Sequence, residues 1–125
     1  MEVPHKRSAL IVDDNKLVRK LLQKILHRAG WDHDLAENGL EALEKLRERP
    51  GDFDLVITDI VMPEMDGATL VKTIAEELPR TKVLMVSGYA EDHLVRENLR
   101  VDGHRFLAKP FTEDDLLAEI DEMFA

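Results

Sequence analysis

The feature that most constrains this chain is a strict alternation of short strand-like runs with longer segments of helical periodicity. The strand-like runs span residues 9–12, 31–36, 54–58, 82–87 and 104–109. Each is followed by a segment with helical spacing of apolar residues or a helix-capping residue at its start. Such alternation favours parallel strands joined by helical crossovers. We therefore predict an α/β fold with a five-stranded parallel sheet.

The expected helices are bounded by capping residues, glycine or proline. Their ranges are 15–29, 38–49, 66–78, part of 88–99, and 112 to the C-terminus. Asn38 and Thr112 are side chains that commonly cap helix N-termini. In the second helix, four apolar residues are expected to face inward, namely Leu40, Ala42, Leu43 and Leu46. The second strand-like run, WDHDLA, is more polar than the others, so we expect it at an edge of the sheet.

Length and composition exclude several other classes of protein. With 125 residues the chain suits one domain, and we expect a tail over 1–7 and a folded unit over 8–125. The net charge of −9 argues against direct binding to nucleic acid. The absence of cysteine excludes disulfides and thiolate metal sites. We see neither a signal peptide nor a run of membrane-spanning length, and therefore expect a cytoplasmic protein with no direct membrane contact.

Polar residues follow four of the expected strands. Asp13 and Asp14 follow the first, Asp59 the third, Ser87 ends the fourth and Lys109 ends the fifth. In open parallel sheets, ligands bind outside the carboxyl ends of the strands. If the first and third strands are neighbours, three carboxylates meet at one edge, with a hydroxyl and an ammonium beside them.

Three neighbouring carboxylates repel one another unless a proton or a cation offsets their charge. Ligands that are all oxygen suit a hard ion such as Mg²⁺. A carboxylate beside such an ion can attack phosphorus and form an acyl phosphate. Lys109 and Ser87 could then contact phosphoryl oxygens. The residues alone therefore indicate Mg²⁺-assisted phosphoryl transfer onto a carboxylate.

Four stretches together resemble the receiver domain of two-component response regulators, namely LIVDDN, VITDIVMPEMDG, VLMVSGYAED and FLAKPF. The resemblance covers residues 8–124. It implies a flavodoxin-like (βα)5 three-layer sandwich with strand order 2-1-3-4-5. It further implies that Gly67 lets the helix after the third strand start close to the site.

The resemblance also implies roles for individual residues. Asp59 matches the phosphoacceptor, and Asp13 and Asp14 match the acidic pair that organises Mg²⁺, with Asp14 the more direct ligand. The backbone carbonyl of Val61 would be a further metal ligand. The peptide bond between Lys109 and Pro110 is typically cis in the family.

The remaining matches concern catalysis and switching. Lys109 matches the invariant lysine, and Ser87 the hydroxyl position that is more often threonine. Phe106 matches the aromatic switch position, where tyrosine is frequent. The stretch RVDGHRF departs from the usual Gly-Ala dipeptide before the fifth strand, and this departure falls near the output face rather than in the chemical site.

The function implied is that of a phosphoacceptor signalling domain. A histidine kinase or histidine-phosphotransfer domain would donate phosphate to Asp59, and the face of the fourth helix, fifth strand and fifth helix would change its preference for an output protein. Such a chain is no enzyme beyond its own phosphorylation and dephosphorylation. SGYAED and FLAKPF resemble receivers of hybrid sensor histidine kinases, which favours an excised receiver over a single-domain regulator or a phosphorelay shuttle.

Other interpretations are less well supported. An Mg²⁺-dependent phosphohydrolase would usually carry a second aspartate two residues after the nucleophile, where this chain has Val61. A flavodoxin-like cofactor binder would need a glycine-rich loop after the first strand, where DDNKLVRK stands. On the first helix, Val18 and Leu22 either pack in the core or contact the helical bundle of a phosphodonor.

Overall fold

The computed structural model of the chain describes residues 6–60, 65, 67–87 and 105–125. Strands and helices alternate as expected over residues 8–87, and a strand followed by a helix covers residues 105–123. The strands are β1 (Ser8–Val12), β2 (Asp32–Ala36), β3 (Leu55–Asp59), β4 (Lys82–Ser87) and β5 (Arg105–Ala108). The helices are α1 (Lys16–Arg28), α2 (Gly39–Glu48), α3 (Gly67–Glu77) and α5 (Glu113–Met123). The helix expected within 88–99 lies outside the described residues.

All five strands belong to one parallel sheet in the order β2-β1-β3-β4-β5. This arrangement confirms the predicted fold class and strand order. β1 lies between β2 and β3, with Val12 opposite Thr58. The residues that follow β1 therefore emerge beside the end of β3. β2 lies at an edge and most of its residues are only half-buried, as its polar sequence predicted.

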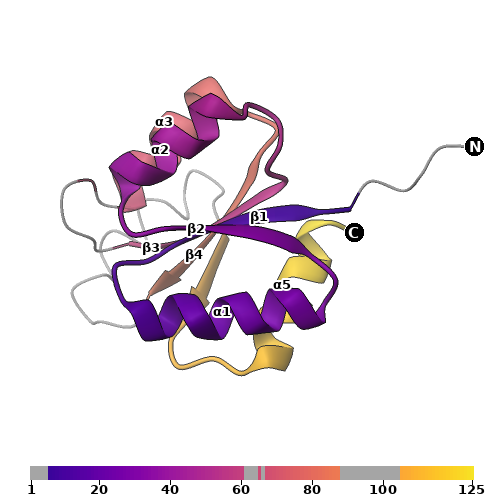
Figure 1. Ribbon diagram of the computed structural model, residues 1–125. Helices are drawn as coiled ribbons and strands as arrows, with labels where there is room; N and C mark the ends of the chain where they lie inside the picture. The colour runs from indigo at the N-terminus through magenta and orange to yellow at the C-terminus, as the bar shows by residue number, and fades with distance from the viewer. Residues whose placement is uncertain (1–5, 61–64, 66, 88–104) are drawn as a thin grey trace, which may run out of the picture.

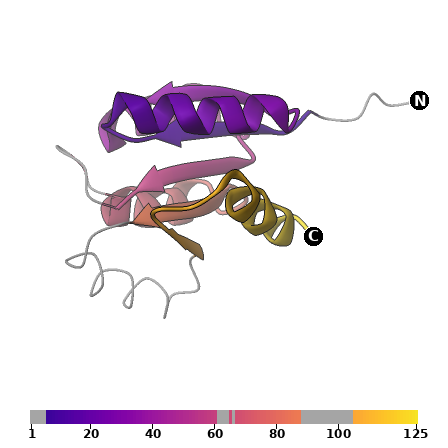
Figure 2. The same cartoon turned by 90° about the horizontal axis from the view of Figure 1, so that it is seen from below.

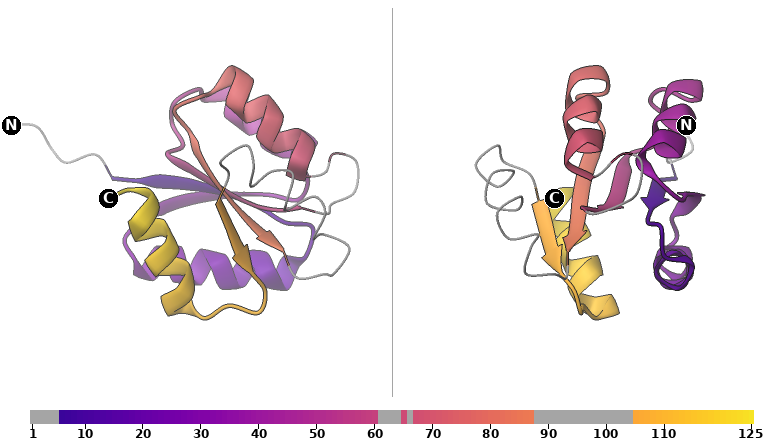
Figure 3. Two further views of the ribbon diagram at one scale, coloured as in Figure 1. Left: turned by 180° about the vertical axis from the view of Figure 1, so that it is seen from behind. Right: turned by 90° about the vertical axis from the view of Figure 1, so that its left-hand side faces the viewer.

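Helices cover both faces of the sheet, so the molecule has three layers (Figures 1 and 3). α2 and α3 lie on one face, and α1 and α5 lie on the other. Figure 2 shows α1 running along the half of the sheet that holds β1 and β2, with α5 beside the other half. Alternate residues of β1 serve the two cores. Ala9 and Ile11 pack with Leu22 and Ile120, whereas Leu10 packs with helix α2 and α3 side chains.

Three helices begin at capping residues that satisfy free backbone donors. The Asn15 side chain accepts hydrogen bonds from the N–H groups of Leu17 and Val18. Asn38 does the same for Glu41. Thr112 and Asp115 form a reciprocal capping box at the start of α5. The predicted caps Asn38 and Thr112 are thus confirmed.

The expectation that Leu40 faces inward was wrong, because this side chain is 48% exposed. The buried residues of α2 are Gly39, Ala42, Leu43 and Leu46. These four recur at three- and four-residue spacing and share one face. Leu40 is rotated by about 100° from Gly39 and so points away from that face.

The amino edge of the sheet is closed by aromatic rings and cations. Trp31, which precedes β2, meets Phe124 edge to face with ring centroids 5.4 Å apart. The Arg7 guanidinium lies 4.7 Å from the Phe124 ring centroid, and Lys82 Nζ lies 5.1 Å from it. Lys82 also donates a hydrogen bond of 2.5 Å to the carbonyl of Met123. These contacts hold the end of α5 against the start of the strands. None of the described helices combines the length and apolar character that a bilayer crossing requires.

Candidate functional site

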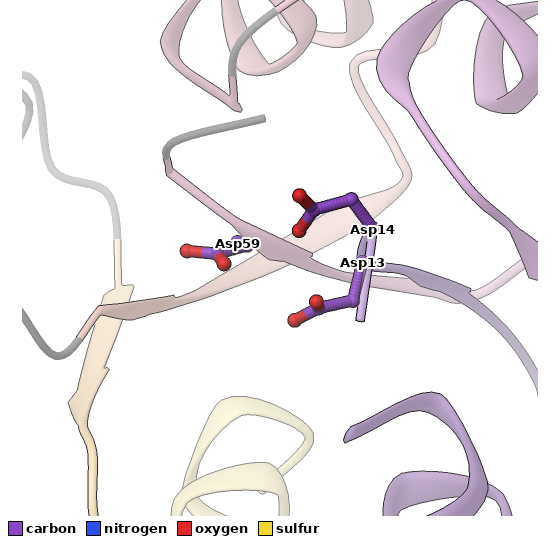
Figure 4. Close-up of side chains that lie close together, drawn as sticks. All are labelled: Asp13, Asp14 and Asp59. Atoms are coloured by element: carbon purple, nitrogen blue, oxygen red, sulfur yellow. The ribbon is translucent and has the colours of Figure 1, made fainter. Parts of the chain in front are cut away.

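The carboxyl edge of the sheet gathers three carboxylates. Asp13 and Asp14 follow β1, and Asp59 is the last residue of the neighbouring β3. One carboxylate oxygen from each of the three lies within 4.8 Å of the other two. Figure 4 shows the Asp13 and Asp14 side chains turned toward the side on which Asp59 lies. The pairing of β1 with β3 therefore creates the cluster that the strand ends predicted.

Three hydrogen bonds hold Asp13 in place, and one of its carboxylate oxygens stays available for a ligand. The residue is 1% exposed. Its N–H donates to the carbonyl of Ala36 at 3.1 Å, and its Oδ1 accepts from the N–H of Asn15 at 2.8 Å. Its own carbonyl accepts from Arg19 Nη1 at 2.6 Å. Oδ2 is buried and accepts no hydrogen bond from any described residue.

Asp59 is also buried, at 7% exposed. Its Oδ1 accepts a hydrogen bond from the N–H of Ile60 at 2.7 Å. Its carbonyl accepts from Thr58 Oγ1 at 2.9 Å. Its Oδ2 faces Lys109, with the ammonium nitrogen 3.4 Å away. One carboxylate oxygen is thus fixed by backbone and the other faces a cation.

Lys109 follows β5 and reaches across to both buried acids. Its Nζ lies 3.4 Å from Asp59 Oδ2 and 3.6 Å from Asp13 Oδ2. The second distance is too long for a hydrogen bond, so that contact is electrostatic. The peptide bond between Lys109 and Pro110 is cis, as the resemblance implied. Lys109 is the cation that the structure places within 4 Å of both Asp13 and Asp59, among the residues described.

One ammonium does not neutralise three carboxylates. At separations near 4.8 Å, two carboxylates repel by about 3 to 4 kcal/mol at an effective dielectric near 20. Burial raises the pKa of Asp13, and the nearby Asp59 and Asp14 carboxylates raise it further. The hydrogen bond from Asn15 and the charge of Lys109 oppose that rise without cancelling it. The site therefore stores electrostatic repulsion that a cation would relieve.

The donor set fits a hard divalent cation. All three side chains offer carboxylate oxygens, which Mg²⁺ and Ca²⁺ prefer. Among the described residues no donor reaches Asp13 Oδ2, a buried acceptor, as expected for an atom that a metal ion would satisfy. Asp14 is exposed and leaves one side of the cluster open to water or substrate. The cluster could thus hold a metal ion and admit a further ligand.

Gly67 allows α3 to begin directly against the site. Its N–H donates to the carbonyl of Ile60 at 2.7 Å. A Cβ at this position would lie only 2.2 Å from the carbonyl oxygen of Asp59. No side chain larger than hydrogen fits there without moving backbone. The role expected for Gly67 is therefore confirmed.

The structure brings Asp13, Asp14, Asp59 and Lys109 together, as the sequence predicted. Phe106 lies half-buried in β5 and packs against a small cluster formed by Ile60, Val71 and Met85. Val61 and the side chain of Ser87 lie outside the described residues, so their predicted roles stay predictions.

Sequence reasoning missed two residues that hold Asp13. Asn15 was expected only as the start of a helix, yet its N–H also fixes the Asp13 carboxylate. Arg19 is the fourth residue of α1 and donates to the Asp13 carbonyl. A basic residue five positions after an acidic pair was the available signal, but the basic composition of this helix obscured it.

Comparison with known proteins agrees with this geometry. Residues 9–121 match the family model described as the response regulator receiver domain. The chain is 40% identical over 118 residues to the response regulator receiver protein CpdR of Brucella abortus, covering 94% of this chain and 96% of CpdR. It is 41% identical over 117 residues to the sensor kinase CckA of the same organism, covering 93% of this chain. It spans only 12% of the length of that kinase.

Solved structures show the same fold. A response regulator receiver domain protein from Clostridium thermocellum superposes with a TM-score of 0.87 and 26% identity, covering 93% of this chain and 92% of that one. The chemotaxis protein CheY4 of Vibrio cholerae superposes with a TM-score of 0.81 and 29% identity, covering 94% and 98%. The five-stranded parallel sheet and its flanking helices are therefore shared with these proteins.

Proposed function

Because the chain belongs to the response regulator receiver domain family, we propose that it is a phosphoacceptor switch in which Asp59 receives a phosphoryl group. Receiver domains of this family act in two-component systems with kinases and phosphotransfer partners. The observation that carries the proposal is the convergence of Asp13, Asp14 and Asp59 beside Lys109. The donor in our proposal is a phosphohistidine of a histidine kinase or histidine-phosphotransfer domain.

The reaction transfers phosphorus from nitrogen to oxygen. A carboxylate oxygen of Asp59 attacks the phosphorus, the P–N bond breaks, and the imidazole nitrogen leaves with the electron pair. Lys109, which already faces Asp59 Oδ2 at 3.4 Å, pairs with a phosphoryl oxygen. Asp13, Asp14 and Asp59 would hold a Mg²⁺ ion, whose positive charge would offset both the carboxylates and the phosphoryl oxygens.

The product is an acyl phosphate, which water hydrolyses back to the carboxylate and inorganic phosphate. We propose no enzymatic activity on other substrates, so the chain only gains and loses its own phosphoryl group. Phosphorylation would shift an equilibrium between two states, through Ser87 and Phe106, toward the one preferred by an output protein. The half-buried position of Phe106 supports this role, since such a ring can change its packing. The cytoplasmic location stays a prediction.

Helix α1 offers a contact surface for the phosphodonor. Leu17 is 76% exposed and Leu21 is 48% exposed, one turn apart on the same helix. Leu22 is buried, so the core interpretation of that residue was correct, and Val18 packs at the margin of the core. α1 begins three residues after Asp13, so its first turn lies beside the acidic cluster. We propose that a helical donor contacts the exposed leucines while its phosphohistidine reaches Asp59.

The relatives include a stand-alone receiver and a receiver within a kinase. The sequence prediction favoured a receiver excised from a hybrid kinase. We keep this as our proposal for the parent protein. Sequencing the full gene would test it, since kinase domains in the same reading frame are expected.

The phosphoacceptor is tested by incubating the protein with acetyl phosphate, with and without Mg²⁺, and measuring the intact mass. We expect one phosphoryl adduct that requires Mg²⁺ and is absent from Asp59→Asn. Asp52→Asn is the matched control, because Asp52 is an exposed acid on the loop before the same strand. A phosphorylated histidine-phosphotransfer domain serves as a second donor. Failure of both donors, or an adduct that survives in Asp59→Asn, would refute the proposal.

A further inference from the structure

We propose that Arg19 is a positioning residue for Asp13, which sets the geometry of the metal site without contacting the metal. This inference rests on the proposed function, because it concerns the same acidic cluster. Arg19 Nη1 donates to the backbone carbonyl of Asp13 at 2.6 Å. The contact is made to the carbonyl and not to the carboxylate, so Arg19 leaves the ligand atoms free.

The hydrogen bond between Arg19 and Asp13 is strong and shielded from water. The Arg19 side chain is only 11% exposed, so water competes weakly for its donors. A hydrogen bond from a charged guanidinium is shorter and stronger than a neutral one. The other contact of this guanidinium, an ion pair of 3.7 Å with Glu37, involves a side chain that is 69% exposed. A pair with one exposed partner at this distance contributes little, so we take the contact with the carbonyl as the stronger one.

Asp13 needs this restraint because the neighbouring carboxylates repel its own carboxylate. Its carboxylate is buried among like charges, and Oδ2 accepts no hydrogen bond from the described residues. A free turn could relax by rotating the carboxylate away from Asp59. Three hydrogen bonds limit that movement: the N–H of Asn15 holds Oδ1 of the carboxylate, while the bonds from Asp13 N–H to Ala36 and from Arg19 to the carbonyl hold the backbone that carries it. Arg19 supplies the one of these three that comes from a side chain.

The restraint also links two loops at the carboxyl edge. Arg19 extends from α1 to the end of β1, and its second nitrogen faces Glu37 in the loop after β2. The N–H of Asp13 is bonded to the carbonyl of Ala36 at the end of β2. The turn after β1 is thus fixed from both neighbouring segments. Asp13 is presented to the cation already oriented, which lowers the cost of binding.

The test measures Mg²⁺ affinity by isothermal titration calorimetry with Mg²⁺ alone. Arg19→Met keeps an apolar stem and removes the donors, and we expect the dissociation constant to rise five- to tenfold. Arg19→Lys keeps one charged donor and should recover part of the loss. Glu37→Gln is the matched control, because it weakens the exposed ion pair and leaves the carbonyl bond intact. We expect a change below twofold for it.

A double-mutant cycle separates positioning from general destabilisation. In an Asp13→Asn background, Arg19→Met should change the remaining Mg²⁺ affinity by less than twofold, since the residue that Arg19 orients has lost its charge. An equal loss in both backgrounds would overturn the inference, as would wild-type affinity in Arg19→Met. Should Arg19→Met fail to fold, as judged by circular dichroism, the same cycle is run with Arg19→Lys. A wild-type protein that binds no Mg²⁺ would instead refute the metal site of the proposed function.

Discussion

The two edges of the sheet differ in how their charged groups are compensated. At the amino edge, charged groups meet partners: Arg7 and Lys82 lie over the Phe124 ring, and the Asp54 carboxylate accepts the N–H of Ser8 at 2.9 Å. At the carboxyl edge, Asp13 and Asp59 are buried beside each other with Lys109 as their shared cation. One edge stabilises the fold, and the other holds charges that destabilise it until a ligand arrives.

This difference shows where a domain of this size can place an unfavourable site. The acids stand at the ends of β1 and β3, two adjacent interior strands whose side chains contribute to both cores. Strands so well buried can hold repelling groups in fixed positions. The cost is offset by packing elsewhere, including the aromatic pair at the far edge. The groups that stabilise the fold and the acids of the candidate site thus lie at opposite ends of the strands.

The largest expected effect comes from breaking the amino edge. Trp31→Ala removes a ring that is 8% exposed and packs against Phe124. We expect the free energy of unfolding in urea to fall by about 3 to 5 kcal/mol. Mg²⁺ affinity of the folded fraction should stay within twofold, because the ring lies at the opposite edge from the acids. The milder Trp31→Phe, which keeps an aromatic ring, is the control. A tenfold loss of Mg²⁺ affinity in folded protein would show that the edges are coupled.

Gly67→Ala should damage the carboxyl edge and the fold together. The added methyl would meet the Asp59 carbonyl at 2.2 Å, so backbone must shift next to the phosphoacceptor. We expect a loss of about 1 to 3 kcal/mol and slower phosphorylation by acetyl phosphate. Gly30→Ala is the control, since Gly30 has a φ of +86° and open space around it. That variant should lose stability but keep its phosphorylation rate, and equal slowing in both would contradict the prediction.

Asp13→Asn should reveal the repulsion at the carboxyl edge. Without metal, we expect the free energy of unfolding at neutral pH to be unchanged or higher by up to about 2 kcal/mol, while Mg²⁺ binding weakens. The pKa of Asp13 is raised in the folded state, so its contribution to stability is present at low pH and lost as pH rises through that value. The advantage of the variant should therefore grow with pH. Urea unfolding between pH 4 and 7 measures this difference in stability. A clear loss of metal-free stability at pH 7 would contradict the idea that the three carboxylates repel one another.

Asp34→Asn should have the smallest effect on the free energy of unfolding. The pH dependence of that effect should be opposite in sign to that of Asp13→Asn. Burial would raise the pKa of Asp34, but hydrogen bonds from the Leu35 N–H, Lys45 and Arg49 lower it overall. This acid contributes stability above its ordinary pKa, and the contribution is lost as pH falls. Since the side chain is 37% exposed, solvent screening keeps the effect below about 1 kcal/mol. We expect the variant to be slightly less stable at pH 7, and the difference from wild type to shrink as pH falls through the lowered pKa of Asp34, by the same urea measurement. A deficit that grows toward low pH would contradict the paired-acid interpretation.

Much of the fold could be predicted because local sequence patterns determine where its helices and strands lie. Helical spacing and the caps Asn38 and Thr112 located the helices, and apolar runs located the strands. The order of the strands came from family resemblance, since periodicity says nothing about which strands pair. Leu40 is apolar yet exposed, because its position in the first turn of α2 lies about 100° around the helix axis from Gly39 and outside the buried face.

The candidate site could be predicted at the level of residues but not of their environments. Strand ends pointed to Asp13, Asp14 and Asp59, yet adjacent Asp13 and Asp14 differ from buried to exposed, which no spacing reveals. The amino-edge cluster joins Arg7, Trp31 and Phe124, which only the finished fold brings together. Long-range contacts of this kind depend on tertiary packing rather than on local sequence.

The aromatic pair has an optical consequence. Trp31 is the one tryptophan of the chain, and it lies against Phe124 and Arg7, at the far end of the strands from Asp59. Its fluorescence will follow detachment of α5 and global unfolding, with little direct quenching by ions at the acidic cluster. A change in its emission on phosphorylation would therefore measure how far a local event travels along the sheet, using a probe that the protein already contains.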